Sequence, residues 1–411
     1  MKQAYPPSIT GKGAGFAEGG SVLDHSFGKG DPYTLGVEEE YMLLDGQTFD
    51  LVQHIDTVLA AISGHELETH INAELMQSVI EIATPVCRTA GDIDRELRKL
   101  RAYVAEIAAT DNLRVGSAGT HPFSLFERQR ITARDRYRHL IDQMQYVARR
   151  ELIFGLHIHV AVDDPEKAIQ VVNGLLAHIS SLLALSASSP FWRGEATGLA
   201  SSRQIVFAAF PRSGPPPRFR DYADYAEVVG QLEKTGCIAD YTHIWWDIRL
   251  HPRLGTVEIR ICDAVTRVED AVALAAFCQA LVKHYSERYD RGDEIPSYHR
   301  ILTTENKWLA ARYGLEAPVM DLATGRRNRV PVAQLVRRTL RDIEPHAQEL
   351  GSERELEGIR EILSRGNGAD RQRRVFNANN DIVEVVREIA DATEAAAEAK
   401  PQAAGAAPPA A

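Results

Sequence analysis

Apolar residues recur at every third or fourth position between residues 92 and 109, which is the spacing of one face of a helix. The pattern predicts an amphipathic helix in this segment. Its apolar face is formed by Ile93, Leu97, Leu100, Val104 and Ile107.

Two other helices are predicted from the residues that begin them. Asp164 followed by Pro165 is typical of a helix N-terminus and predicts a helix to about residue 188. Thr266 and Glu269 have the spacing of a capping box, which predicts a helix to about residue 289. Further helices are expected at residues 135–150, 305–313, 332–350, 353–364 and 380–398.

Shorter apolar runs predict the strands. They are expected at residues 33–44, 77–84, 114–119, 154–162, 203–210, 244–250 and 255–262. Strands and helices do not alternate regularly along the chain. The order therefore favours an α+β fold, with an antiparallel sheet and helices packed on one face, over a doubly wound parallel sheet.

Four of the predicted strands carry ionisable side chains within apolar surroundings. Residues two apart on a strand project from the same face, so each pair in these segments shares a face. The residues are Glu38 and Glu40 in GVEEEYMLLD, Glu81 in QSVIEIATP, His157 and His159 in GLHIHVAV, and Glu258 and Arg260 in TVEIRICDA.

A half-exposed strand is the ordinary explanation for any one of these patterns, and a single histidine is more often structural than a ligand. Four such strands in one chain favour a functional site. Their polar faces use Glu, His and Arg, whereas the exposed face of an ordinary strand usually carries a mixture of Lys, Thr, Ser and Gln. If the faces converge, four carboxylates oppose a single positive charge, that of Arg260. Carboxylates so close stay ionised only when cations lie among them.

The candidate ligands are rich in oxygen and lack sulfur, which favours Mg²⁺ or Mn²⁺. Zinc is less favoured because the chain has neither HExxH nor a cysteine cluster. Carboxylate-held magnesium usually also binds substrate phosphates. The pattern thus indicates a metal-nucleotide enzyme, although the chain has no P-loop motif.

Composition and charge narrow the possible binding partners and the expected cellular location. A formal net charge of −10 argues against non-specific binding to nucleic acid. The four cysteines are scattered and are expected to be reduced thiols. No apolar signal segment is seen at the N-terminus, and the most apolar stretch, residues 175–187, is too short to cross a membrane. We therefore expect a cytoplasmic protein with no membrane or nucleic-acid partner.

The two ends of the chain differ in composition from the middle. Residues 1–31 are rich in Gly, Ser and Lys and predict a flexible leader. Residues 392–411 are rich in Ala and Pro and predict a disordered tail. Residues 32–391 are expected to form one catalytic domain.

Several segments, in this order, resemble those of the carboxylate-amine ligase family, also called type 2 glutamate–cysteine ligases. They are GVEEEYMLLD, QSVIEIATP, GTHP, GLHIHV, SSPFWRGEATGLASSRQIVFAAFPRSG, TVEIRICDA and ENKWLAARYGL. The similarity covers about residues 33–390. More distantly, the ExE, HxH and ExR strands are similar to those of glutamine synthetase. This resemblance implies a saddle-shaped sheet that holds divalent metals between ATP and glutamate.

The resemblance also implies roles for individual residues. Arg260 is expected to contact phosphate or an acyl-phosphate, and Arg203 to hold a substrate carboxylate. His159 is expected either to support a ligand or to contact the nucleotide. The implied metal ligands are Glu38, Glu40, Glu81, His157 and Glu258.

Three further features stay open. Glu74 is either another ligand or a surface residue. Arg312, four residues after Trp308, either binds substrate or packs along the aromatic ring. An arginine cluster at residues 326–329 is more typical of a solvated loop than of a phosphate site.

The resemblance implies that ATP phosphorylates glutamate and that an amine, most plausibly that of cysteine, then displaces the phosphate to form an amide. Cofactors would be ATP and Mg²⁺ or Mn²⁺, and relatives suggest a homodimer. One alternative is a phosphotransferase related to the guanidino kinases, which would stop at a phosphorylated product. The other is a non-catalytic oligomeric protein that has kept the fold.

Overall fold

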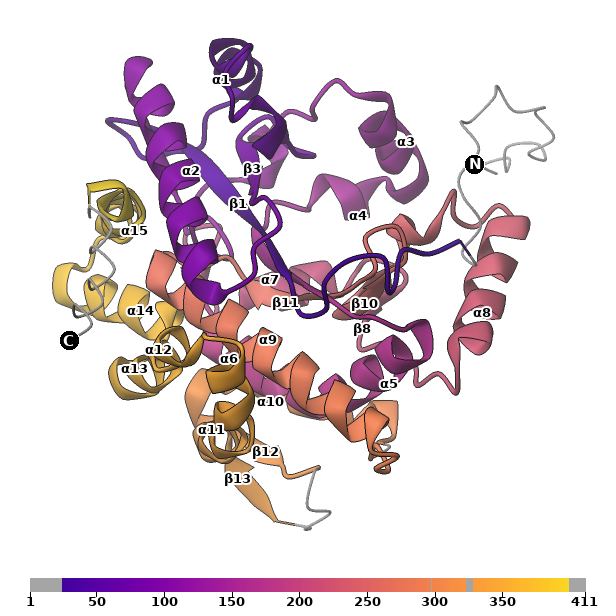
Figure 1. Cartoon of the computed structure of the whole chain (residues 1–411). Coiled ribbons are helices and arrows are strands. Elements are labelled where there is room, and N and C mark those ends of the chain that lie inside the picture. The colour runs from indigo at the N-terminus through magenta and orange to yellow at the C-terminus, as the bar shows by residue number, and fades with distance from the viewer. Residues whose placement is uncertain (1–23, 297, 323–327, 399–411) are drawn as a thin grey trace, which may run out of the picture.

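The centre of the fold is a long strand near the N-terminus, β1 (Leu35–Asp45), to which three other strands pair. The protein is described from a computed structural model, which covers residues 24–296, 298–322 and 328–398. The strand order of the main sheet is β10-β11-β5-β1-β3-β2, with β4 also paired to β1, and every pairing is antiparallel (Figure 1). Its other strands are β2 (Ile71–Ala73), β3 (Val79–Ala83), β4 (Leu113–Gly116), β5 (Gly155–Ala161), β10 (Ile248–His251) and β11 (Thr256–Asp263).

The register of the sheet brings the ionisable residues of four strands together. Glu38 pairs with His157 across β1 and β5, and Glu40 pairs with Glu81 across β1 and β3. Glu258 pairs with His159 across β11 and β5. Directly opposed residues of antiparallel strands have their Cβ atoms about 5 Å apart. The register therefore gathers these side chains on one face of the sheet.

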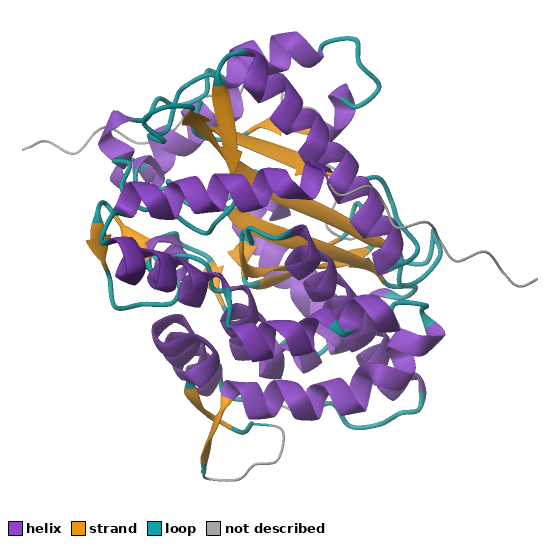
Figure 2. Cartoon of the chain, turned by 90° about the vertical axis from the view of Figure 1, so that its left-hand side faces the viewer, coloured by secondary structure: helices purple, strands orange, loops and turns teal. Residues whose placement is uncertain are grey.

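Helices cover the other face (Figures 1 and 2). Val37, Tyr41 and Leu43 of β1 belong to a large apolar core together with residues of α2 (Ala90–Thr110), α5 (Pro165–Leu175) and α9 (Val268–Asp290). The segment Pro165–Ser186 is long and apolar enough to pass a test for membrane spans, but 83% of its apolar window is buried inside the protein. The segment is therefore part of the protein core.

A second, smaller core covers one end of the face that carries the ionisable residues. Met42 and Leu44 of β1 pack there with Val385 and Ile389 of α15 (Ile382–Glu398). The remaining helices are α1 (Ile55–Ile62), α3 (Asp135–Met144), α4 (Tyr146–Arg149), α6 (Ile179–Ser186), α7 (Ser202–Phe207), α8 (Tyr222–Lys234), α10 (Arg300–Tyr313), α11 (Val332–Glu349), α12 (Glu353–Leu356), α13 (Gly358–Arg365) and α14 (Gly368–Asn379). Three two-stranded pairs complete the described strands: β6 (Phe191–Trp192) with β7 (Glu195–Ala196), β8 (Ser213–Gly214) with β9 (Trp245–Trp246), and β12 (Pro318–Met320) with β13 (Arg329–Pro331).

The α+β class and the antiparallel sheet are confirmed, whereas several predicted elements are wrong in detail. Residues 203–210 were expected as a strand but begin within α7, because the Ser201 side chain caps that helix by accepting from the Gln204 amide. The predicted capping box at Thr266 is absent, since α9 begins without a side-chain cap. A 3₁₀ turn divides the helix expected at residues 165–188, and Gln145, with a φ of 48°, ends α3.

The packed structure extends beyond the expected domain, residues 32–391, on both sides. Residues 24–31, assigned to the leader, pack on the domain through the buried side chain of Phe27. The last helix, α15, continues to Glu398, beyond the boundary expected at residue 391. The rest of the predicted leader and tail, residues 1–23 and 399–411, and residues 326 and 327 of the arginine cluster, lie outside the described residues.

Candidate active site

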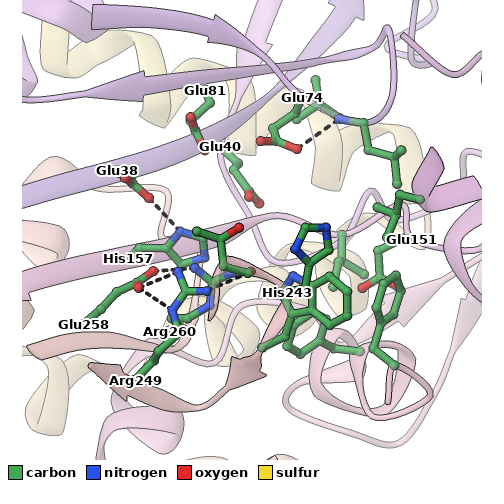
Figure 3. A pocket seen from close by; sticks show the side chains of 18 of the residues that line it. Glu38, Glu40, Glu74, Glu81, Glu151, His157, His243, Arg249, Glu258 and Arg260 are labelled. Carbon is green, nitrogen blue, oxygen red and sulfur yellow. Dashed lines mark hydrogen bonds and ion pairs between the residues drawn. The ribbon is translucent and has the colours of Figure 1, made fainter. Parts of the chain in front are cut away.

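A cavity of about 550 Å³ is lined by Glu38 and Glu40 of β1, among other residues (Figure 3). It therefore lies on the sheet face opposite Val37 and Tyr41, which pack in the core with α2 and α9. It contains eight of the nine residues predicted for the site: Glu38, Glu40, Glu81, His157, His159, Arg203, Glu258 and Arg260. Seven of them lie on β1, β3, β5 and β11, so the sheet register explains why they meet, and Arg203 joins them from α7. The cavity thus collects residues from positions 38 to 260 of the chain.

One end of the cavity has the donor atoms of a cation site. One ligand atom each from Glu38, His159 and Glu258 lie within 4.8 Å of one another. Among the described residues, the Nε2 atom of His159 is buried and has no hydrogen-bond partner. Two carboxylates and an imidazole nitrogen so arranged fit a divalent cation such as Mg²⁺ or Mn²⁺.

The charge states of the residues at this end of the cavity also fit a divalent cation. Burial opposes the ionisation of Glu38, but its neighbours His157 and His159 outweigh burial and lower its pKa. Burial also lowers the pKa of His157, to about 4, and this neutral ring lies with Nδ1 3.0 Å from Glu38 Oε2. Burial opposes a charge on His159, but Glu258 and Glu38 together outweigh it and raise the pKa, so a bound metal would replace a proton on this ring.

Two arginines hold Glu258 in place. Arg249, opposite it on β10, donates from Nε at 2.8 Å and from Nη2 at 2.6 Å to the same carboxylate oxygen. Arg260 binds the other oxygen. Despite burial, these two cations keep the pKa of Glu258 well below its ordinary value. Glu258 is therefore a fixed anion that also brings two positive charges to the cavity.

Three carboxyl groups form an acidic cluster beside this end: Glu40, Glu74 and Glu81. Burial, reinforced by Glu74, raises the pKa of Glu40 to about 7. Burial and the other carboxylates raise the pKa of Glu81 well above its usual value. Arg136 approaches Glu74 only to 3.9 Å. This cluster is short of positive charge, which is the condition in which a second cation would bind.

Arg203 forms another part of the wall. It lies on α7, is almost fully buried, and makes only long hydrogen bonds of 3.4 Å to the carbonyls of Ile261 and Arg260. Its Nε has no partner among the described residues. Gly155 makes room for it, because a Cβ at that position would lie 2.5 Å from Nη2.

The position of α7 depends on a buried anion behind it. The carboxylate of Asp263, 4.0 Å from Arg203, accepts hydrogen bonds from the hydroxyls of Ser189 at 2.7 Å and Ser201 at 2.8 Å. Gly119 allows this close packing, since a Cβ there would meet Asp263 at 2.6 Å. The serine-rich segment before α7 thus fixes the arginine through β11.

Arg312 is the predicted site residue that the structure does not place in the cavity. Its guanidinium donates to the carbonyl of Gly198 and lies over the ring of Tyr313, with 4.9 Å to the ring centroid. Trp308, on the same helix, is 45% exposed. Of the two interpretations left open for Arg312, the geometry favours the structural one.

Glu74, which the sequence left open as a ligand or a surface residue, lines the cavity. The cavity also contains residues that the sequence patterns did not single out: Arg136, Tyr137, Glu151, His243 and Arg249. Arg249 could have been found, since it is flanked by Ile248 and Leu250 in a predicted strand. Glu151 could not, because it lies in the loop between α4 and β5 and only the fold brings it to the cavity.

The family model and the related sequences that match this chain indicate the same family. The model of glutamate–cysteine ligase family 2 matches residues 34–392. A relative from Rubrobacter xylanophilus, provisionally named glutamate–cysteine ligase 2-1, is 44% identical over 369 residues, which are 90% of this chain and 97% of the relative. A relative from Solibacter usitatus, provisionally named glutamate–cysteine ligase 2, is 41% identical over 361 residues, covering 88% of this chain and 93% of the relative.

Solved structures share the fold at much lower sequence identity. The glutamate–cysteine ligase of Francisella tularensis in complex with AMP superposes with a TM-score of 0.64 at 12% identity, covering 89% of both chains. A bifunctional glutathione synthetase from Pasteurella multocida gives the same TM-score at 16% identity, covering 89% of this chain and 53% of that one.

Proposed function

The chain belongs to glutamate–cysteine ligase family 2, and from this premise we propose that it is an ATP-dependent ligase that joins glutamate to an amine, with cysteine as the first candidate. The observation that carries the proposal is the convergence of Glu38, His159, Glu258 and Arg260 from three neighbouring strands in one cavity. A shared fold with an AMP-bound ligase supports a nucleotide as one substrate.

The cation site supports the use of a triphosphate. Glu38, His159 and Glu258 would hold one divalent ion, and the cluster of Glu40, Glu74 and Glu81 would hold another. When bound, such ions supply electrostatic stabilisation to a phosphoryl group in transfer. The observed donors, all oxygen or imidazole nitrogen, suit Mg²⁺ or Mn²⁺.

The residues of the chain then have separate tasks. A carboxylate resists direct attack by an amine, so the γ-carboxylate of glutamate would first accept the terminal phosphoryl group of ATP. Arg260 and Arg249 are fixed by Glu258 and would stabilise negative charge on that group. The amine would then attack the acyl carbon, form the C–N bond, lose a proton and release phosphate.

A screen of amines with glutamate and Mg-ATP tests this proposal, with phosphate release and product mass read together. Phosphate release in step with a γ-glutamyl amide would support it. ADP formation with a phosphorylated product and no amide would instead indicate a phosphotransferase. Absence of any turnover across the screen would favour the non-catalytic alternative.

The cation site is tested by substitution. Glu38→Gln and Glu258→Gln should each lower kcat at least about a hundredfold, because each removes a charged ligand at the phosphoryl group. Glu127→Gln is the control, since Glu127 pairs with Arg193 on the surface. Turnover close to that of the wild type in either cavity variant, with folding confirmed by circular dichroism, would refute the metal assignment.

A further inference from the structure

The side chain of Arg260 has little to hold it in the cavity. Among the described residues it forms one ion pair, with Glu258, and its Nε atom is buried without a hydrogen-bond partner (Figure 3). The direction in which its guanidinium points therefore depends on where the main chain of Arg260 lies.

That main chain departs from the regular ladder of the sheet. The pairing of β11 with β5 is regular up to Ile259 and resumes at Cys262 with a shifted register. Arg260 and Ile261 form a β-bulge at this shift, because both lie opposite the single residue His157. Bulges next to active sites change the direction of a side chain, and their polar main-chain groups need partners outside the regular strands.

Two neighbouring segments supply these partners. The amide of Arg260 donates to the carbonyl of Asp247 at 2.8 Å, and Asp247 lies in the bend before β10. The side chain of Gln204, on α7, donates to the carbonyl of Ile261 at 2.7 Å. The bulge is thus held between α7 and the bend at Asp247.

Asp247 is fixed in turn by a buried ion pair to a helix outside the cavity. Lys307 of α10 donates from Nζ to Asp247 Oδ1 at 2.6 Å, and the two side chains are only 11% and 1% exposed. Lys307 lies in the segment ENKWLAARYGL, which contributes no residue to the cavity wall, and Asp247 does not line the cavity either. Neither residue is therefore placed to touch a ligand there.

We propose that Lys307 and Asp247 are positioning residues for Arg260. The ion pair fixes the Asp247 carbonyl, the carbonyl fixes the bulge, and the bulge directs the guanidinium. Replacing a buried ion pair with apolar residues is often neutral for stability, so stability alone gives no reason for this pair. The inference rests on the proposed function, in which Arg260 stabilises charge on the transferred phosphoryl group.

A double-mutant cycle tests whether Lys307 acts through Arg260. Lys307→Met should lower kcat at least about tenfold with a smaller change in KM for glutamate, because a shift of about 1 Å in a charge-stabilising group is costly. In an Arg260→Met background, where no guanidinium is left to position, the same substitution should lower kcat less than about twofold. Equal effects in the two backgrounds would overturn the inference.

Calorimetric titration gives a readout that does not require turnover. The Kd for a non-hydrolysable ATP analogue with Mn²⁺ should rise about fivefold in Lys307→Met and should not rise further when Arg260→Met is combined with it. An unchanged Kd together with an unchanged kcat in Lys307→Met would also overturn the inference.

Urea unfolding separates positioning from support of the fold. Lys307→Met leaves Asp247 buried without its cation and should lower the urea midpoint. The double variant Asp247→Leu with Lys307→Met removes both charges, so it should recover most of the midpoint while kcat stays low. This variant keeps the test decisive if Lys307→Met does not fold. Recovery of kcat together with the midpoint would show that the pair only supports the fold.

The matched control is another buried lysine. Lys167 of α5 is 6% exposed and pairs with Asp163 and Asp290 away from the cavity. Lys167→Met should lower the urea midpoint and leave kcat and the nucleotide Kd as in the wild type. Equal losses of nucleotide affinity in Lys167→Met and Lys307→Met would assign both to general destabilisation and overturn the inference.

The titrations also separate this inference from the proposed function. Coupled effects of Lys307→Met and Arg260→Met on nucleotide affinity, with no amide formed in the amine screen, would sustain the positioning role and reject the ligase. Amide formation with additive effects on kcat and on Kd would do the opposite.

Discussion

Gly155 shows how one residue controls the shape of the cavity. Its amide donates to Glu40 at 2.5 Å, and its missing side chain leaves the space that Arg203 fills. A Cβ would lie 2.5 Å from Arg203 Nη2 and 3.1 Å from His157 Nε2. The first of these atoms is the end of a flexible side chain, so it can move at little cost in stability.

Gly155→Ala should therefore impair the site more than the fold. We expect the KM for glutamate to rise about tenfold, because Arg203 is displaced, and the free energy of unfolding to change by less than about 1 kcal/mol. Steady-state kinetics and urea unfolding measure the two effects. Gly230→Ala is the control for KM, since a Cβ there would meet no atom within 4 Å apart from the backbone of its own helix, α8. An unchanged KM would contradict this role for Gly155.

Glu151 should make the unliganded protein less stable as the pH rises. Burial raises its pKa in the folded state to about 8, above the ordinary value of about 4.3, so the folded state retains a proton that the unfolded state has released. Each increase in pH within this window favours unfolding. Histidines with lowered pKa values, such as His157 at about 4, act in the opposite sense below about pH 6.5.

The test is urea unfolding between pH 6.5 and 9. The free energy of unfolding of the wild type should fall by about 2 kcal/mol more than that of Glu151→Gln across this range. Glu40 and Glu81 contribute the same trend in both proteins, so the difference isolates Glu151. Parallel pH profiles would show that this carboxyl titrates normally.

At the scale of elements, β1 is held from its helical side by a buried ionic network. Arg101 of α2 binds both oxygens of Glu39, at 3.0 Å and 2.5 Å, and Tyr41 donates to the same carboxylate. Arg101 also donates to the carbonyls of Val265 and Thr266, just before α9. The network joins α2, β1 and the end of β11, directly behind Glu38 and Glu40.

Removing one residue of this ionic network should lower the stability of the fold. Arg101→Met leaves Glu39 buried without its cation, and we expect a loss of about 3–5 kcal/mol in the free energy of unfolding, measured with urea. The double variant Glu39→Met with Arg101→Met should recover part of this loss, because no charge is left unpaired. A single variant within about 1 kcal/mol of the wild type would show that the network contributes little.

The sequence predicted elements well where periodicity was long, and poorly where a local cap or turn decided the outcome. The helix expected at residues 92–109 is α2, and the ionisable strands are β1, β3, β5 and β11. The same-face pairs were predictable because strand geometry alone determines them. The apolar run at residues 203–210 was misassigned as a strand, since the cap by Ser201 starts α7. Glu151 required the complete fold.

At the scale of the molecule, the cavity connects both ends of the sheet, so ligands that occupy it should stabilise the whole domain. Manganese with a non-hydrolysable ATP analogue at about 100 times its Kd contributes about 2.7 kcal/mol, or several degrees in Tm. Differential scanning calorimetry should show this rise in the wild type. Glu38→Gln should lose most of it, and an equal rise in that variant would place the metal elsewhere.

The position of β1 between β3 and β5 has a consequence for synthesis on the ribosome. This strand leaves the ribosome early, but its neighbour β5 follows more than a hundred residues later, and β11 ends only at Asp263. Until β5 emerges Glu38 has no histidine opposite it, and until β11 emerges the cavity lacks Glu258 and Arg260. A nascent chain should therefore acquire nucleotide affinity abruptly, after translation has passed β11, and arrested chains of increasing length would reveal that step.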